Sequence, residues 1–189
     1  LSDETRISLM SGDFPPLVRR PPNSSLNAKY LKKTVKHPVS IMIWGCFSHY
    51  GLGPMCIVDG TINNTKYINI LKENLLPYME NSCKGSMLFQ DDNATCHRHK
   101  NVIDFLEENH INRIFWPAQS PDLNPIENLW SFFKMKIFKH HPKNKEDLKR
   151  IAKRVWQNEI PRELVDNLIS SMPRRINMLV EAKGGHINY

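Results

Sequence analysis

The sequence is poor in cysteine: its 189 residues include four, and no two of them form a Cys-x-x-Cys pair. Few and unpaired cysteines argue against a disulfide scaffold and favour a reducing compartment. No apolar run approaches the roughly 20 residues that a membrane-spanning helix needs, and the first residues do not resemble a secretory signal. Glycine-rich phosphate loops of the GxGxxG and GxxxxGK[ST] types are also missing. The sequence therefore predicts neither a membrane helix nor a nucleotide site built on such a loop.

Charge is unevenly distributed along the chain. Residues 1–130 hold 13 Lys+Arg and 13 Asp+Glu, whereas residues 131–189 hold 13 Lys+Arg and 6 Asp+Glu, so the last part carries the whole net charge of +7. A basic segment of this kind fits a polyanionic partner, most simply nucleic acid. The alternative is a solvated helical surface that happens to be basic, and charge alone does not decide between the two.

The pattern of apolar residues predicts a mixed α/β fold. Alternating or β-branched segments predict strands at 5–10, 39–50, 54–60, 86–90 and 111–116, with a turn at 51–53 that joins the second strand to the third. Helical periodicity is found at 64–80, at 98–109 and repeatedly after residue 124, whereas the proline-rich residues 13–38 are expected to be loop. This order predicts three antiparallel strands plus two strands reached through helical crossovers, with helices on the faces of the sheet. The ribonuclease H-like architecture has this order, although the pattern leaves several α/β folds open.

The helices after residue 124 have recognisable starts. Asn124 is predicted to cap a helix whose third residue is Glu127, and Asn144 is predicted to cap the next one. A last helix opens near Pro173. Its apolar stripe consists of Ile176, Leu179 and Val180.

Carboxylates occur where the predicted elements begin or end. Asp91 and Asp92 end the strand at 86–90, Glu127 lies in the first turn of a helix, and Asp3 lies in a strand at the start. Sites in open α/β sheets gather at the carboxyl ends of strands, so these groups could converge. Carboxylate oxygens suit Mg²⁺ or Mn²⁺, and two such ions can promote displacement at a phosphodiester.

Simpler explanations exist for each carboxylate. Glu127 has the spacing of a capping box, Asp3 could end an exposed strand, and Asp91-Asp92 could form a turn. A zinc site is a weak alternative, because Cys96, His97 and His99 are too close together for a usual set of four ligands. The tryptophans fall in apolar patterns and are predicted to pack in the core.

Several segments resemble one family of enzymes. The string WPAQSPDLNPIENLW (116–130) resembles the signature of transposases of the mariner superfamily, Tc-type branch. LFQDDNATCH (88–97) is similar to the FQQDNAPCH segment of that family. Further similar strings occur in the same order, namely SDET (2–5), TVKHP (34–38), SIMIWGCFSHYGLGP (40–54) and SMPRRINMLVEAKGGHINY (171–189).

The resemblance implies a domain organisation and a catalytic triad. It implies a ribonuclease H-like catalytic domain over residues 1–139, with its first strand truncated, and a basic C-terminal helical extension over 140–189. The family carries two aspartates and a glutamate, and its spacing of 34 residues between the last two matches Asp92 and Glu127. The first aspartate corresponds to Asp3. Asp91 stands where the family usually has Gln, and Asn93 and His97 match motif positions, so these three are candidate auxiliary residues.

The function implied is metal-dependent DNA strand cleavage and strand transfer, the chemistry of cut-and-paste transposition and DNA integration. It implies two Mg²⁺ or Mn²⁺ ions, with Asp3 bridging both ions and Asp92 and Glu127 each holding one. The partners would be transposon ends and target DNA, with no membrane and no small-molecule cofactor. The full-length protein would be a homodimer and would work in the nucleus. Candidate contacts to the DNA backbone are Lys134, Lys136, Lys139 and Lys143.

Two other functions are compatible with parts of the sequence. A domesticated or decayed transposase remnant could serve as a non-catalytic DNA-binding or interaction module, and the truncated start and Asp91 favour this alternative. A ribonuclease H-type nuclease could act on RNA–DNA hybrids, but the string at 116–130 argues against it. The helix-turn-helix region with which the family reads transposon ends is not in this sequence, so we expect non-specific and salt-dependent DNA binding.

Overall fold

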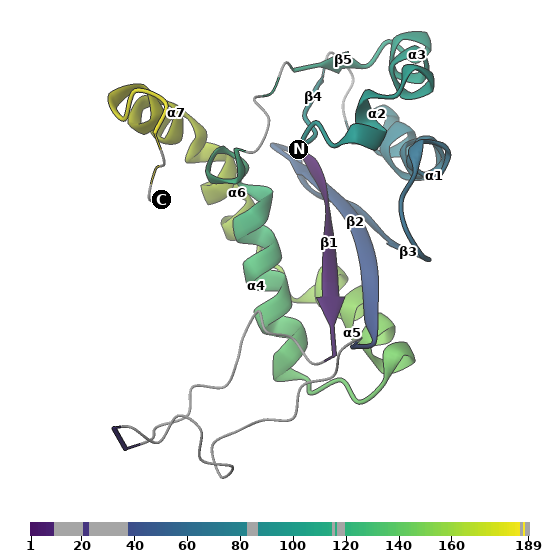
Figure 1. The fold of residues 1–189 in the computed structure, drawn as a ribbon, viewed down its shortest axis with the longest axis vertical. Coiled ribbons are helices and arrows are strands. Elements are labelled where there is room, and N and C mark those ends of the chain that lie inside the picture. Colours follow the sequence, from purple (N-terminus) through teal and green to yellow (C-terminus); the bar gives the residue numbers. More distant parts are fainter. Residues whose placement is uncertain are drawn as a thin grey trace.

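The computed structural model describes residues 1–9, 21–22, 38–82, 87–114, 116, 120–185 and 187. Strands β1 (Ser2–Ser8), β2 (Ser40–Ser48) and β3 (Gly51–Val58) form an antiparallel sheet in the order β1-β2-β3 (Figure 1). Strands β4 (Leu88–Phe89) and β5 (Asn112–Arg113) form a separate parallel pair. The Ser2 amide donates to the Gln90 carbonyl at 3.0 Å and connects β1 to the end of β4. The mixed α/β fold is confirmed, and the five strands of the described residues are divided between two sheets.

The hairpin between β2 and β3 turns earlier than the sequence predicts. His49 and Tyr50 form a two-residue loop, and Ser48 pairs with Gly51. The turn predicted at 51–53 is therefore wrong, because Gly51 already belongs to β3. Its φ of 122° lies in a region that a glycine adopts without strain, which lets the chain re-enter the sheet directly after the loop.

The predicted helix at 64–80 is one continuous helix with a π-helical turn inside it. It consists of α1 (Asn64–Ile70), the π-helical η2 (Leu71–Leu75) and α2 (Leu76–Ser82). Pro77 is the second residue after the π-helical turn, and proline has no amide hydrogen for a regular i−4 bond. The next helical pieces are the 3-10 turn η3 (Thr95–Arg98) and α3 (Lys100–Glu108).

The second half of the chain is helical. It contains the 3-10 turn η4 (Pro121–Leu123), α4 (Ile126–Lys139), α5 (Lys145–Asn158), α6 (Arg162–Ser170) and α7 (Met172–Glu181). Asn144 caps α5 as predicted, since its side chain accepts from the Asp147 amide at 2.8 Å. Asn124 does not cap α4 with its side chain, whose buried Oδ1 has no hydrogen-bond donor among the described residues. Its backbone carbonyl accepts from the Glu127 amide at 3.1 Å instead.

The strands separate two apolar clusters, because successive side chains of a strand point to opposite faces. Ile43 of β2 packs with residues of α4 and α5, whereas Trp44 packs with residues of α1 and α3 on the other face (Figure 1). Trp44, Trp130 and Trp156 are buried, which confirms their prediction as core residues. Within the described residues, no helix has the length and apolarity needed to cross a lipid bilayer.

Candidate functional site

A cavity of about 360 Å³ lies where β1, the segment after β4 and the start of α4 meet. Asp3, Asp92 and Glu127 all line it, so the structure brings together the three carboxylates that the sequence singles out. Asn93, Trp116, Pro121 and Asn124 are among the other residues of its wall.

Asp3 is buried in β1 and is not the exposed strand end that the simplest explanation required. Its side chain is 6% exposed, and the Trp130 indole Nε1 donates to its Oδ2 at 3.1 Å. Gly45 pairs with Asp3 across the sheet and makes room for Trp130, since a Cβ at Gly45 would lie 2.8 Å from the indole ring. Burial and the nearby carboxylates of Glu4, Glu127 and Asp92 raise the pKa of Asp3 to about 8.

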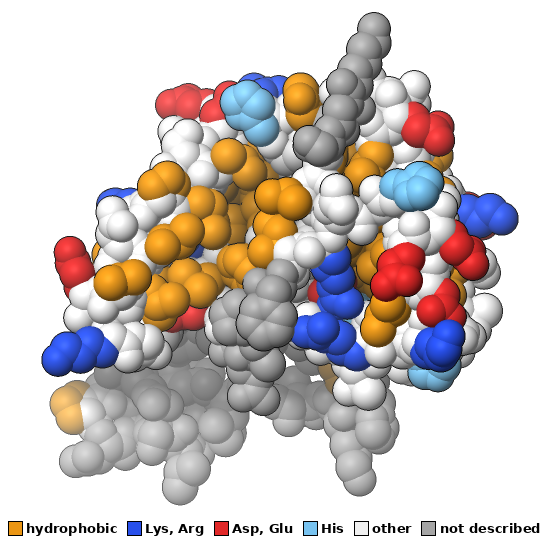
Figure 2. Space-filling view, turned by 90° about the horizontal axis from the view of Figure 1, so that it is seen from above, with side chains coloured by type: hydrophobic (Ala, Val, Ile, Leu, Met, Phe, Trp, Pro, Cys, Tyr) orange, Lys and Arg blue, Asp and Glu red, His pale blue; other side chains and the backbone are white. Residues whose placement is uncertain are grey.

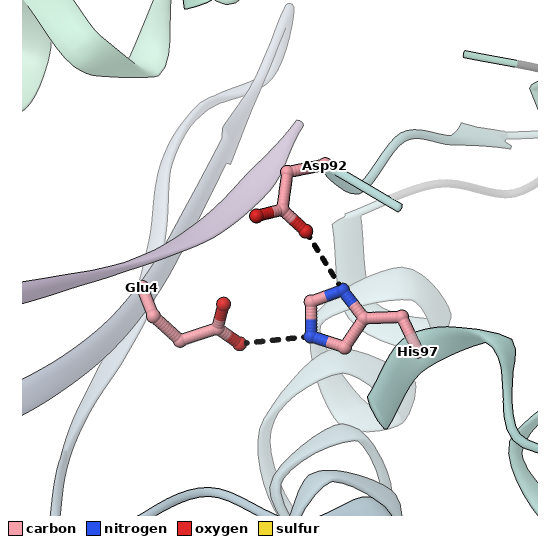
Figure 3. Close-up of side chains that lie close together, drawn as sticks. All are labelled: Glu4, Asp92 and His97. Carbon is pink, nitrogen blue, oxygen red and sulfur yellow. Dashed lines mark ion pairs between the residues drawn. The ribbon is translucent and has the colours of Figure 1, made fainter. Parts of the chain in front are cut away.

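The next residue, Glu4, points to the opposite face of the sheet and meets His97 there (Figure 3). His97 Nε2 lies 3.4 Å from a Glu4 carboxylate oxygen, and His97 Nδ1 lies 2.9 Å from Asp92 Oδ1. The His97 ring is 1% exposed and stacks on Tyr67 with ring centroids 3.9 Å apart. Burial alone would lower the pKa of His97, but the two carboxylates outweigh it and raise the pKa to about 10. His97 is therefore an imidazolium that joins two acids.

Asp92 is fixed through one of its two oxygens. Oδ1 contacts His97 and also accepts from the Ala94 amide at 2.9 Å. The hydrogen bond with His97 lowers the pKa of Asp92 from its ordinary value. Figure 3 shows the second oxygen pointing away from His97. Asp92 is thus an ionised carboxylate with one oxygen free of these two contacts.

Glu127 lies in the first turn of α4 and is partly exposed to solvent. Capping does not explain it, since α4 has no side-chain hydrogen bond at its start. Partial burial raises the pKa of Glu127, nearby Lys134 opposes the shift, and Asp92 adds to it. The surroundings of Asp3 and Glu127 in this cavity therefore disfavour the charged form of each carboxyl group.

Asp91 and Asn93 stabilise the segment that carries Asp92. Asp91 is 1% exposed, and Arg113 Nη2 donates to its Oδ1 at 2.6 Å and to Asn93 Oδ1 at 2.8 Å. Asn93 has a φ of 63°, and its side-chain amide donates to the Trp116 carbonyl. The negative charge added by Asp91 is therefore paired with Arg113, and Asp91 is absent from the lining of the cavity.

The four candidate lysines do not form one strip. Lys134 lies close enough to Glu127 to affect its pKa. Lys136 lies over the Phe132 ring at 5.4 Å, and residues two apart on a helix point to opposite sides. Lys139 is at the end of α4, about 18 Å along the helix axis from Glu127, and Lys143 follows the helix.

Sequence reasoning missed four residues that hold the site: Glu4, Tyr67, Arg113 and Trp130. Of these four, only Glu4 could be noticed from neighbouring sequence alone, because a strand residue next to Asp3 must face the other side of the sheet. Arg113 meets Asp91 through the pairing of β4 with β5. Trp130 reaches Asp3 across 127 sequence positions, a contact that no local pattern reveals.

Comparison with known proteins identifies the family of this chain. The family described as DDE superfamily endonuclease matches residues 21–149. The Tcb2 transposase of Caenorhabditis briggsae is 33% identical over 189 residues, which are 100% of this chain and 69% of that protein. The chain belongs to the DDE superfamily of endonucleases. With transposase relatives along its whole length, this DDE domain is a DNA-cleaving polynucleotidyl transferase of the transposase type.

Solved structures of Mos1 transposase share the fold. The paired-end complex of Mos1 with its left transposon end matches with a TM-score of 0.81 and 19% identity, over 99% of this chain and 55% of that chain. The catalytic domain of Mos1 mariner transposase matches with a TM-score of 0.71 and 20% identity, over 79% of this chain and 76% of that chain. These matches support the ribonuclease H-like architecture that the family resemblance implies and that the order of strands and helices allows.

Proposed function

We propose that the cavity is the metal-dependent site at which this DDE domain cleaves and joins DNA strands, with Asp3, Asp92 and Glu127 as its metal ligands. The observation that carries the proposal is the convergence of these three carboxylates on one cavity. Asp3 and Glu127 have raised pKa values there, and a bound cation would relieve the repulsion between their charges.

The donor set fits a hard divalent cation. All three groups offer oxygen atoms, which Mg²⁺ and Mn²⁺ prefer. The related Mos1 paired-end complex has been solved with Mn and with Mg. We propose two ions of this type, which would polarise the phosphodiester and stabilise charge on the attacking and leaving oxygens.

The neighbouring residues would hold these ligands in place. Trp130 donates to Asp3, so the carboxyl group keeps one orientation. His97 and the Ala94 amide engage a single oxygen of Asp92 and leave the other for the cavity. Asn93 ties the same segment to the Trp116 carbonyl, and Arg113 neutralises Asp91 behind it. Asp91, Asn93 and His97 are thus assigned supporting roles, and ligand binding is left to the triad.

DNA is the proposed partner, as transposon ends and as target. Lys134 lies two helical turns after Glu127 in α4 and lowers the pKa of that carboxyl, so it is the best placed of the four lysines to meet a phosphate near the site. Lys136, Lys139 and Lys143 would contact the backbone farther away. We further propose that the intact protein acts in the nucleus as a homodimer that holds two ends, for which light scattering of its DNA complex provides a test.

Nicking of supercoiled DNA in Mn²⁺ tests the proposal. Asp92→Asn and Glu127→Gln are expected to reduce nicking about a hundredfold or more, since each removes a charged ligand. His97→Asn, which frees Asp92, is expected to reduce it less and to raise the Mn²⁺ concentration required. Glu108→Gln, an exposed acid at the end of α3, serves as the control and should nick like the parent.

The outcomes separate the alternatives. Equal nicking by the parent and both triad variants would show that the ligands are assigned wrongly. A folded parent that binds DNA but never nicks it would favour the decayed or domesticated remnant. Cleavage confined to RNA–DNA hybrids would favour the ribonuclease H-type nuclease.

A further inference from the structure

Helix α7 is attached to the protein in an unusual way. Its predicted apolar stripe is largely exposed, since Ile176 is 50% exposed, Val180 is 71% exposed and Leu179 is half-buried. Figure 2 shows apolar side chains gathered on the face seen from above Figure 1, on the side where α7 lies. The one buried residue of α7 is a charged one, Arg175, which is 3% exposed.

The guanidinium of Arg175 connects three chain segments. Nε donates to Ser171 Oγ at 2.8 Å, at the start of α7 itself. Nη1 donates to the Asp122 carbonyl of η4 at 3.0 Å, and Nη2 donates to Asn128 Oδ1 of α4 at 2.7 Å. Asp122 and Asn128 stand on either side of Glu127 in the sequence. Arg175 therefore holds both ends of the short segment that contains Glu127.

A second contact from the C-terminal region supports the same segment. The Ile187 amide donates to Asp122 Oδ2 at 3.3 Å, and the Ile187 side chain is 4% exposed. A buried guanidinium is costly unless its donors find acceptors, so the position of Arg175 and the position of its acceptors depend on each other. Loss of Arg175 should loosen η4 and the first turn of α4 together.

This segment forms one wall of the cavity, where Pro121, Asn124 and Glu127 line it. We propose that Arg175 is a positioning residue for Glu127 and that α7 is thereby part of the metal site. The proposal rests on the proposed function, because it takes Glu127 as a metal ligand. Arg175 lies in the string at 171–189 that resembles the transposase family, and the resemblance gives it no role.

Direct binding of Mn²⁺ in the absence of DNA, measured by calorimetry, tests the proposal. Arg175→Gln is expected to weaken Mn²⁺ binding by about tenfold, the lower end of what loss of a residue behind a metal ligand costs. The Mn²⁺ concentration that half-saturates nicking should rise by a similar factor, with smaller loss of the rate at saturating Mn²⁺. Arg174→Gln removes the same charge from the exposed neighbouring position and should leave both quantities unchanged.

Asn128→Ala keeps the test decisive if Arg175→Gln fails to fold. It removes one acceptor and leaves the other two contacts of Arg175. Like Arg175→Gln, it should weaken Mn²⁺ binding. If both variants fold, their effects on Mn²⁺ affinity should not add, because they break the same contact. Unchanged affinity in folded Asn128→Ala, or in folded Arg175→Gln, would overturn the role of Arg175. A parent protein that binds no Mn²⁺ would instead overturn the proposed function itself.

Discussion

At the scale of single residues, Asp3 shows most clearly why the cavity would suit a cation. It is a buried carboxyl group with three other carboxylates nearby, and its pKa of about 8 means that it retains a proton at neutral pH without a cation. Asp92 differs, because His97 keeps it ionised. Binding of a divalent ion should therefore release a proton, chiefly from Asp3.

Without divalent ions, the protein should become less stable as pH rises between about 4 and 8. Folded Asp3 keeps its proton up to a pKa of about 8, whereas an unfolded aspartate with the ordinary value of 3.8 has already lost it. The native state binds more protons in this interval, so the free energy of unfolding falls as pH rises. Thermal unfolding in EDTA measures this fall, which should amount to several degrees, since about 1 kcal/mol shifts Tm by about 2–4 °C.

Asp3→Asn separates this effect from the rest of the protein. His97, whose pKa is raised to about 10, also contributes stability that declines as pH rises past its ordinary range, so the parent alone is not diagnostic. The variant should lose less stability than the parent between these pH values. Parallel curves for the two proteins would contradict the shift assigned to Asp3.

At the scale of elements, local sequence patterns predict those helices and caps that depend only on neighbouring residues. The spacing of apolar residues in α4 and α5 and the cap at Asn144 are sufficient to predict those helices. The π-helical turn before Pro77 and the short loop at His49–Tyr50 depend on backbone details that periodicity does not carry. The stripe at Ile176, Leu179 and Val180 does not predict how α7 is held, because Ile176 and Val180 are exposed and Leu179 is half-buried. The buried residue of α7 is Arg175, which meets oxygen acceptors.

The candidate site also has a part that the sequence predicts and a part that only the folded structure reveals. The resemblance supplies Asp3, Asp92 and Glu127, and the cavity then brings them together. Contacts of Trp130 and Arg175 join residues far apart in sequence, and only the packed helices create them.

The junction of β2 with α4 and α5 offers a test at this scale. In Gly45→Ala, the new Cβ would lie 2.8 Å from Trp130 and 2.9 Å from Trp156, so one ring must move. We expect a loss of about 1–3 kcal/mol in the free energy of unfolding, measured with urea, as for other overpacked cores. Mn²⁺ binding should weaken too, because Trp130 donates to Asp3. Ser40→Ala in the same strand is the control, and equal stability of the two variants would argue against this packing.

At the scale of the whole molecule, the basic charge of the last 59 residues is distributed over several surfaces. Part of it is paired locally, as in Arg150 with Asp147, Arg154 with Glu159 and Arg162 with Asp166. Lys134 of α4 lies close enough to Glu127 to lower its pKa. The boundary between a catalytic domain and an extension at residue 139 stays a prediction, and α5 shares an apolar cluster with β2 and α4.

Replacing Lys134, Lys136, Lys139 and Lys143 with Gln should flatten the salt dependence of DNA binding. For every phosphate that the variant no longer neutralises, the slope of log K against log salt falls by about 0.9 on duplex DNA. Fluorescence anisotropy with a labelled duplex at several salt concentrations measures it. A set of four exposed lysines elsewhere provides the matched control: Lys66, Lys72, Lys100 and Lys183. Equal slopes for both sets would assign the first set to the solvated surface.

The residues that form and support the cavity are far apart in the sequence, and this has a consequence for protein synthesis. Asp3 belongs to β1, Trp130 and Glu127 belong to α4, and Arg175 belongs to α7. On the role proposed for Arg175, a nascent chain lacks a complete metal site until α7 has left the ribosome. Translation products that end before α7 would then bind Mg²⁺ or Mn²⁺ about tenfold more weakly than the finished chain.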